Sequence, residues 1–246
     1  MGVLRGRADA FGAALLDQHM GRAMHSVILE RDDGLVEPDF ELSAYFEEFG
    51  RWGSLDRSAT RSIWGRVLDV GCGAGRVALH LQSRGQPVVG IDVSALAVKV
   101  ARLRGVRTAR AMSVTQADRR LGSFDTIVMM GNNLGLLASR ERARWLLRRF
   151  HGLTTDRGRV VGSTIDPFRT SDPDHLEYHR LNKRRGRMPG QVRLRVRYRN
   201  YATPWFDYLF LSPDELDQIV AGTGWQLARI RTDEPRYLAV LEKDKL

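Results

Sequence analysis

The sequence predicts an α/β fold, with a mostly parallel sheet, helices on both of its faces and a C-terminal antiparallel hairpin. From Arg66 onward, apolar runs alternate with glycine-containing turns and segments of helical periodicity, a pattern typical of parallel strands joined by crossover helices. Near the C-terminus, two strand-like runs lie too close together for a helical crossover, so we expect them to pair antiparallel.

The region that precedes the sheet is expected to be helical and irregular. Periodicity predicts one helix from about Asp9 to Leu29 and a second from about Pro38 to Phe49. We therefore assign residues 1–62 to an N-terminal helical lid.

The core is expected to span residues 63–165 and 212–246. Its candidate parallel strands are Val67–Val70, Val88–Ile91, Ala109–Met112, Thr126–Met130 and Arg159–Ile165. The helical stretches between them are Arg76–Ser83, Ala95–Leu103 and Ser139–Leu153. A last helix, capped by Ser212, and the terminal hairpin follow at Pro213–Gly222, Trp225–Arg231 and Tyr237–Glu242.

Residues 166–211 interrupt this repeat as an insertion before the last helix. They contain a short predicted helix, Pro173–Arg184, and two strand-like runs. In the run Gln191–Arg199 the side chains alternate, which places four arginines on one face: Arg193, Arg195, Arg197 and Arg199.

Composition narrows the class of protein. The 246 residues carry a formal net charge of +10, and nine basic residues without an acidic one lie in Arg180–Arg199. A single cysteine, Cys72, precludes an internal disulfide, and we predict a cytoplasmic location. We expect no membrane span, because the apolar runs end well short of about 18 residues, and no secretory signal.

A glycine-rich turn follows the first predicted strand. Asp69-Val70-Gly71-Cys72-Gly73-Ala74-Gly75 opens a helix, where glycines permit a tight turn and close approach of a ligand. Asp92 ends the next strand 17 residues after Gly75, at a place where a carboxylate can accept hydrogen bonds from both hydroxyls of a ribose. Dinucleotide-binding folds space their last glycine one residue further on.

These two motifs resemble those of class I S-adenosylmethionine-dependent methyltransferases, which have a Rossmann-like sheet. The second motif is Val88 to Ser94, and Phe124–Val128 and Leu153–Ile165 resemble the family's fourth and fifth strands. The resemblance implies S-adenosyl-L-methionine as cofactor and S-adenosyl-L-homocysteine as product. It implies cofactor-binding roles for Asp69, Gly71, Cys72, Gly73, Asp92, Val93, Ser113 and Asn132.

Within this resemblance, Asp69 would hold the ammonium of the cofactor and Asp92 its ribose. Val93 would pack on the adenine, and Ser113 or its backbone would take the place of the acidic residue that many members carry after the third strand. Asn132 and Asn133 follow the fourth strand, where they would fix the acceptor or the amino-acid end of the cofactor, or simply cap the next turn.

Candidate acceptor-side residues lie outside the resemblance. Histidine titrates near neutrality, so His25 in the predicted lid and His175 in the insertion are candidate bases, whereas Asn133, which lies within the resemblance, is a candidate catalytic residue that would fix the acceptor. His175 and His179 share a helix face but lack a third ligand, so we expect no metal. The aromatic run Trp205–Tyr208 would either clamp a flat acceptor or pack the insertion onto the core.

The overall prediction is a methyltransferase that transfers a methyl group to oxygen or nitrogen of a small-molecule acceptor. Residues 166–211 would be its substrate-side insertion. An RNA-directed or ribosome-directed methyltransferase that uses the basic 180–199 segment is the alternative, and a charged edge strand would explain the same arginines. A non-catalytic cofactor-binding protein is a further alternative, against which the complete motif set argues. The motif Asn/Asp-Pro-Pro-Tyr/Phe of enzymes that methylate amino groups of nucleic-acid bases is absent after the fourth predicted strand.

Overall fold

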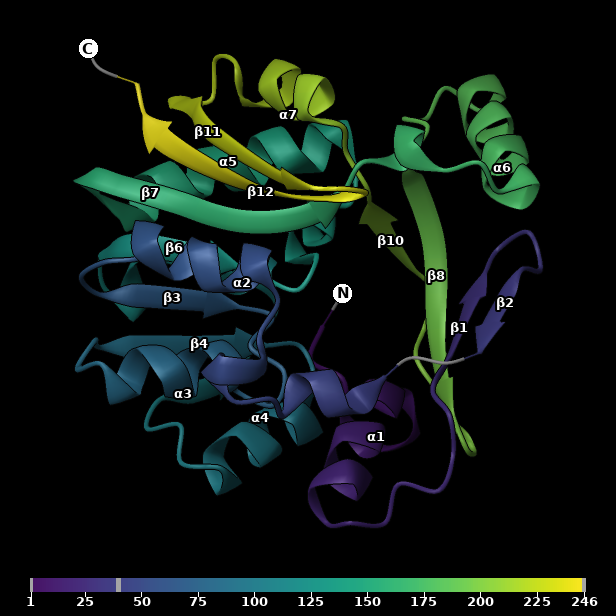
Figure 1. Ribbon diagram of the computed structural model, residues 1–246, viewed down its shortest axis with the longest axis horizontal. Coiled ribbons are helices and arrows are strands. Elements are labelled where there is room, and N and C mark those ends of the chain that lie inside the picture. The colour runs from purple at the N-terminus through teal and green to yellow at the C-terminus, as the bar shows by residue number, and fades with distance from the viewer. Residues whose placement is uncertain (1, 39–40, 245–246) are drawn as a thin grey trace. The chain divides into compact units, whose positions relative to one another are not determined.

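The computed structural model describes residues 2–38 and 41–244, and the chain divides into two compact units. Unit 1 comprises Met1–Trp52, Leu68–Ala117 and Arg193–Phe206, and unit 2 comprises Gly53–Val67, Asp118–Val192 and Asp207–Leu246. The ribbon is shown in Figure 1. The two units are defined by contacts between residues. The division into lid, core and insertion stays a prediction.

Unit 1 contains three strands and two helices of the α/β repeat. They are β3 (Val67–Val70), α3 (Arg76–Ser83), β4 (Val88–Asp92), α4 (Ala95–Leu103) and β5 (Ala109–Ala111). The strands β4 and β5 pair in parallel. Both helices begin and end at the predicted residues, because glycine or serine at their N-caps and glycines shortly after their ends mark the boundaries in the sequence.

Unit 2 contains the C-terminal part of the repeat. Its strands are β6 (Phe124–Met129), β7 (Thr154–Ile165), β11 (Trp225–Asp233) and β12 (Arg236–Lys243). Its α-helices are α2 (Ser54–Ala59), α5 (Arg140–Leu153), α6 (Pro173–Arg184) and α7 (Pro213–Val220). The strands β6 and β7 are parallel, whereas β12 runs antiparallel to both β7 and β11, as Figure 1 shows. The predicted mixed α/β sheet with C-terminal antiparallel strands is confirmed.

The predicted first helix is too long. The helix α1 (Ala10–His19) ends near Gly21, which has φ 68°, a left-handed conformation that glycine tolerates and that stops a helix. The rest of the predicted span leads into β1 (Ile28–Arg31), which forms a hairpin with β2 (Val36–Pro38).

The predicted second helix is also wrong in the part that the structure describes; its residues 39 and 40 lie outside the described residues. Two 3-10 turns take its place, η2 (Leu42–Tyr45) and η3 (Phe49–Arg51). The backbone carbonyls of Tyr45 and Phe46 accept hydrogen bonds from the Arg104 guanidinium, at 3.2 Å each. These tertiary contacts override the helical periodicity.

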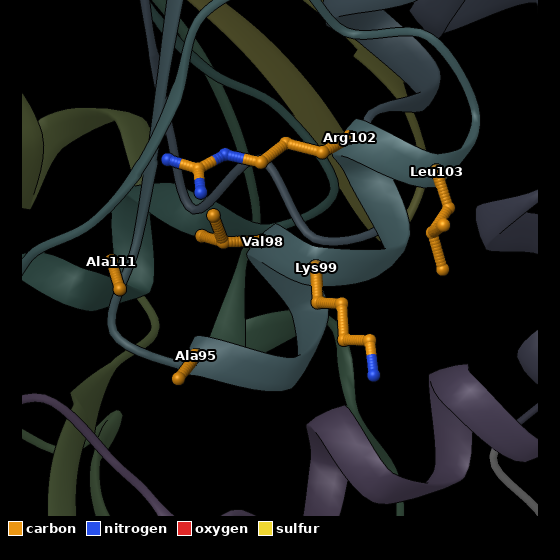
Figure 2. Close-up of a pocket in the computed structure, with 6 residues that line it drawn as sticks. All are labelled: Ala95, Val98, Lys99, Arg102, Leu103 and Ala111. Atoms are coloured by element: carbon orange, nitrogen blue, oxygen red, sulfur yellow. The ribbon is translucent and has the colours of Figure 1, made fainter.

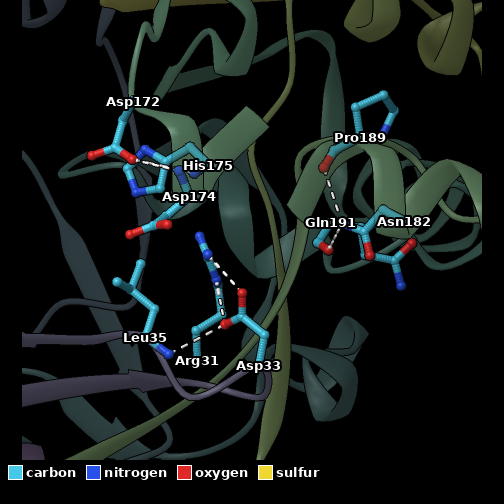
Figure 3. Close-up of polar contacts among 9 residues, drawn as sticks. All are labelled: Arg31, Asp33, Leu35, Asp172, Asp174, His175, Asn182, Pro189 and Gln191. Carbon is cyan, nitrogen blue, oxygen red and sulfur yellow. Dashed lines mark hydrogen bonds and ion pairs between the residues drawn. The ribbon is translucent and has the colours of Figure 1, made fainter. Parts of the chain in front are cut away.

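A second, smaller sheet was not predicted. In unit 1, β1 pairs antiparallel with β2 on one side and with β8 (Gln191–Tyr198) on the other, and β9 (Tyr201–Ala202) continues from β8. The turn of the β1–β2 hairpin is fixed by Arg31, whose guanidinium donates two hydrogen bonds of 2.8 Å to the Asp33 carboxylate (Figure 3). The insertion thus adds its strand to N-terminal strands.

The helix α1 packs closely on α4 within unit 1. Asp9 caps α1, and its carboxylate accepts hydrogen bonds from the amides of Gly12 (3.2 Å) and Leu96 (2.9 Å). A side chain at Gly12 would collide with Ser94, so the glycine permits the close approach of the two helices. Ala14, Leu15 and Val100 are fully buried in the cluster between them. The N-terminal segment is thereby anchored beside the end of β4.

No helix in the described ranges is both long enough and apolar enough to cross a membrane.

Candidate functional site

The loop between β3 and α3 has the backbone that its glycines predict. Gly71, Gly73 and Gly75 have φ values of 72°, 52° and 81°, all in the left-handed region that favours glycine. A Cβ atom on Gly75 would lie 2.5 Å from Cγ2 of Val106, so this position also needs glycine for packing.

Hydrogen bonds tie this glycine loop to the end of β4. The amides of Gly71 and Cys72 both donate to the Ile91 carbonyl, at 2.8 and 3.1 Å, and the Gly73 amide donates to Asp92 Oδ2 at 2.9 Å. Because these amides are already bonded, a ligand would approach the side-chain-free surface of the loop. The Cys72 thiol is buried, and burial raises its pKa well above the ordinary value.

Asp69 is a buried carboxylate beside this loop. Its side chain is 2% exposed, and Oδ2 has no hydrogen-bond partner among the described residues. Burial, and secondarily the charge of Asp92, raise the pKa of Asp69 to about 7, while Arg76 acts in the opposite direction. A buried carboxylate oxygen without a partner is costly, so a cation beside Oδ2 would stabilise it.

Asp92 ends β4 and carries a second carboxylate. Besides the Gly73 amide on Oδ2, it accepts the Ser94 amide on Oδ1 at 2.8 Å. Burial raises the pKa of Asp92 to about 6, although these backbone hydrogen bonds lower it. A carboxylate has about four lone-pair positions, so the hydrogen bonds from the backbone of Gly73, Ser94 and Val93 leave capacity for a hydroxyl of a ligand.

Val93 and Ser113 follow the ends of β4 and β5. Val93 is half-buried and its carbonyl accepts the Leu4 amide at 2.8 Å. The Ser113 hydroxyl is engaged in capping the 3-10 turn η5 (Val114–Gln116). Its backbone amide completes the same capping box, because it donates to Gln116 Oε1 at 3.1 Å.

In unit 2, the loop after β6 is held by the insertion. Asn132 has φ 68°, and its side chain makes no capping hydrogen bond to the 3-10 turn η7 (Asn133–Leu137) that follows. Its carbonyl accepts a hydrogen bond from the Tyr208 hydroxyl. The Tyr208 ring occupies the space where Gly135 lacks a side chain. Tyr208 lies on β10 (Phe206–Leu209) and was predicted only as part of an aromatic run.

The candidate bases have different surroundings. His25 is exposed, lies between α1 and β1 instead of on a helix, and packs edge-on against Tyr198 at 6.3 Å between ring centroids. His175 lies in the first turn of α6, where its amide and that of Asp174 donate to the capping Asp172 carboxylate (Figure 3). In the part of the chain that the structure describes, no three histidine, cysteine or acidic side chains are grouped to hold a metal ion.

The arginine-rich face of β8 is partly neutralised within unit 1. Arg195 donates two hydrogen bonds of 2.8 Å to Glu30, which is directly opposite it on β1, and Arg197 lies 3.4 Å from the same carboxylate. Arg199 pairs with Asp17 at 3.1 Å. Three of the four arginines that the alternation grouped together therefore have acidic partners.

A shallow cavity beside α4 does not involve the predicted site residues. It is lined by Ala95, Val98, Lys99, Arg102, Leu103 and Ala111 (Figure 2). Arg102 extends from there toward β5, where its guanidinium donates to the Ala109 carbonyl.

The prediction missed Tyr45, whose ring lies over the glycine loop. Ring atom Cδ1 is 3.5 Å from the position that a Cβ on Gly73 would occupy. This contact with Gly73 places Tyr45 at the same site, and burial raises the pKa of its hydroxyl. No sequence signal links a tyrosine in a 3-10 turn to a loop almost 30 residues later.

Residues 67–158 match a family model described as a methyltransferase domain. The ubiquinone biosynthesis O-methyltransferase of Idiomarina loihiensis is 31% identical over 86 residues, which are 32% of this chain and 35% of that protein. The chain thus spans about a third of the length of the curated relative that it matches.

Solved structures resemble the whole chain. A SAM-dependent methyltransferase from Bacteroides fragilis in complex with S-adenosyl-L-homocysteine has a TM-score of 0.84 and 25% identity, over 99% of this chain and 98% of that one. The magnesium protoporphyrin IX methyltransferase from Synechocystis PCC 6803 with bound S-adenosyl-L-homocysteine has a TM-score of 0.56 and 17% identity, over 96% and 95%. The second likeness is one of fold alone.

Proposed function

Because the chain belongs to the class I S-adenosylmethionine-dependent methyltransferases, we propose that it transfers a methyl group from S-adenosyl-L-methionine to oxygen or nitrogen of a small molecule. The observation that carries the proposal is a pair of carboxylates at the glycine loop, one buried and one partly buried. Asp69 has an unpartnered oxygen, and Asp92 holds the loop while keeping lone pairs for a ligand.

The residues at the loop fit the cofactor. The orphaned Asp69 Oδ2 would accept a hydrogen bond from the ammonium, which would also lower the pKa of Asp69. Asp92 would accept the two ribose hydroxyls, and Val93 would pack on the adenine. Gly71, Cys72 and Gly73 would lie along the methionine portion, with Ser113 at the adenine. The role of Asn132, which belongs to unit 2, stays a prediction from the resemblance.

The bound cofactor supplies a methyl group that its sulfonium already activates. The protein's contribution is then to orient both reactants for an in-line displacement and to exclude water. A base is required only when the acceptor carries a proton. His25, Asn133 and His175 stay the predicted acceptor-side residues.

A small acceptor is favoured over RNA by the charge distribution on β8. An RNA-binding surface needs basic side chains that are available to phosphates. Glu30 binds Arg195 and Arg197, and Asp17 binds Arg199, so these cations are already engaged.

Isothermal calorimetry with S-adenosyl-L-homocysteine tests the proposal. The wild-type protein should bind it saturably, and Asp92→Ala should weaken binding by about 100-fold, because two charge-assisted hydrogen bonds of about 1.5 kcal/mol each are lost. Asp33→Ala, which removes a carboxylate from the β1–β2 turn, serves as a control and should bind normally. Absence of binding by the wild type would end the proposal.

A further inference from the structure

The segment from Leu42 to Trp52 lies across the glycine loop and the start of α3, all within unit 1. Tyr45 rests on Gly73, and its ring packs edge-on against Phe11 with 5.2 Å between centroids. Trp52, which is 1% exposed, lies under the Arg76 guanidinium at 4.5 Å. This segment therefore covers the surface along which the cofactor would bind.

The position of Tyr45 relative to charged groups is informative. Burial raises the pKa of the Tyr45 hydroxyl, the charge of Arg76 lowers it and the charge of Asp92 raises it, so both charges act on this hydroxyl. Asp92 is the carboxylate that we assign to the ribose. A tyrosine in this place can present its ring to the cofactor and its hydroxyl to polar groups nearby.

One side chain fastens this segment to the loop. Arg104 follows the last turn of α4, and its guanidinium donates to the carbonyls of Ala74 at 2.7 Å and of Tyr45 and Phe46 at 3.2 Å each. The guanidinium also stacks on the Phe46 ring at 4.9 Å. A planar group with five donors in a fixed fork can hold three carbonyls at once, which a lysine cannot reproduce.

We propose that Arg104 is a positioning residue of the cofactor site, which fastens the turn Leu42–Phe46 to Ala74 of the glycine loop and thereby holds Tyr45 over Gly73. This inference rests on the proposed function. Arg104 would therefore affect cofactor affinity indirectly. The contacts described above join its side chain to three backbone carbonyls and to the Phe46 ring.

The same helix supplies a matched control. Arg102 also donates its guanidinium to a backbone carbonyl, that of Ala109, but this carbonyl lies on β5 and not on the glycine loop. Loss of either arginine leaves at least one backbone carbonyl without its guanidinium donor. Only loss of Arg104 should release Tyr45.

The test combines binding and hydrogen exchange. Affinity for S-adenosyl-L-homocysteine is measured by calorimetry for wild type, Arg104→Ala, Arg104→Lys and Arg102→Ala, with a thermal melt of each. Arg104→Ala should bind at least tenfold more weakly, Arg104→Lys should lie between it and wild type, and Arg102→Ala should stay within twofold. Equal affinity of Arg104→Ala and wild type, or equal losses for both alanine variants, would overturn the inference.

A double-mutant cycle separates positioning from general destabilisation. If Arg104 acts through Tyr45, the variant with both Arg104→Ala and Tyr45→Ala should bind within about twofold of Tyr45→Ala alone. Additive losses would contradict this.

Hydrogen exchange of the ligand-free protein distinguishes this inference from the proposed function. Arg104→Ala should speed exchange of the amides in residues 42–46, whereas Arg102→Ala should not, and unchanged exchange in Arg104→Ala would refute the fastening role. If the wild type fails to bind S-adenosyl-L-homocysteine, the proposed function and the assignment to a cofactor site both fall.

Discussion

The raised pKa of Asp69 predicts that cofactor affinity depends on pH. Asp69 has a pKa of about 7 in the ligand-free protein, chiefly because it is buried. An ammonium group binds the ionised carboxylate and not the protonated acid. Apparent affinity should therefore rise with pH and level off above about pH 8, one unit above this pKa.

The magnitude follows from the fraction of Asp69 that is ionised. That fraction is about 0.09 at pH 6 and about 0.76 at pH 7.5 for a pKa of about 7, so affinity should rise about eightfold between them. Asp92, with a pKa of about 6, would add up to about twofold. S-adenosyl-L-homocysteine is the suitable probe, since it carries the ammonium without a sulfonium.

Calorimetry at both pH values, in buffers of different ionisation enthalpy, measures the affinity and the protons released. Asp69→Asn should bind more weakly at pH 7.5 and lose most of the pH dependence, because the amide does not ionise. Equal affinity of the wild type at both pH values, or an unchanged slope in Asp69→Asn, would refute this reasoning.

Two further predictions concern packing and charge. Gly135→Ala should lower the free energy of unfolding by about 1–3 kcal/mol, because its methyl group would displace the Tyr208 ring. Gly152→Ala in α5, where the nearest atom is 3.9 Å away, should be neutral or stabilising; equal melting temperatures of the two variants would contradict the account. The wild type should not bind a single-stranded RNA oligonucleotide near physiological salt in fluorescence anisotropy, and Glu30→Gln, which frees Arg195 and Arg197, should increase any binding seen at low salt. Tight wild-type binding that is lost when Arg193, Arg195 and Arg197 are replaced would instead support an RNA-directed enzyme.

The repeat could be predicted from the sequence because its signals are local. The helix α6 begins and ends where predicted, since Asp172 caps it through the amides of Asp174 and His175 and Pro173 occupies its first position. The glycine loop and Asp92 likewise follow from residues within one β–α–β segment.

The N-terminal region was harder to predict, although one signal was present. The residues Asp33-Gly34 between two apolar runs are typical of a hairpin turn, and they lie between β1 and β2. The pairing of β1 with β8 joins residues more than 160 positions apart, and no local pattern predicts it.

The supporting residues of the site were not predictable for the same reason. Arg104 donates to the carbonyls of Tyr45, Phe46 and Ala74. Because every residue type has a backbone carbonyl, such an acceptor leaves no signal in the sequence. Tyr208 acts on the carbonyl of Asn132 from a distant strand. The sequence therefore indicates the groups that touch the cofactor better than those that position them.

The central claim is that the glycine loop, Asp69 and Asp92 form the cofactor site, and a crystal structure with S-adenosyl-L-homocysteine tests it most directly. The account predicts density with the ribose hydroxyls on the Asp92 carboxylate, the ammonium at Asp69 Oδ2 and the Tyr45 ring over the ligand. Density for the ligand at another surface, with Asp69 Oδ2 still unpartnered, would contradict it.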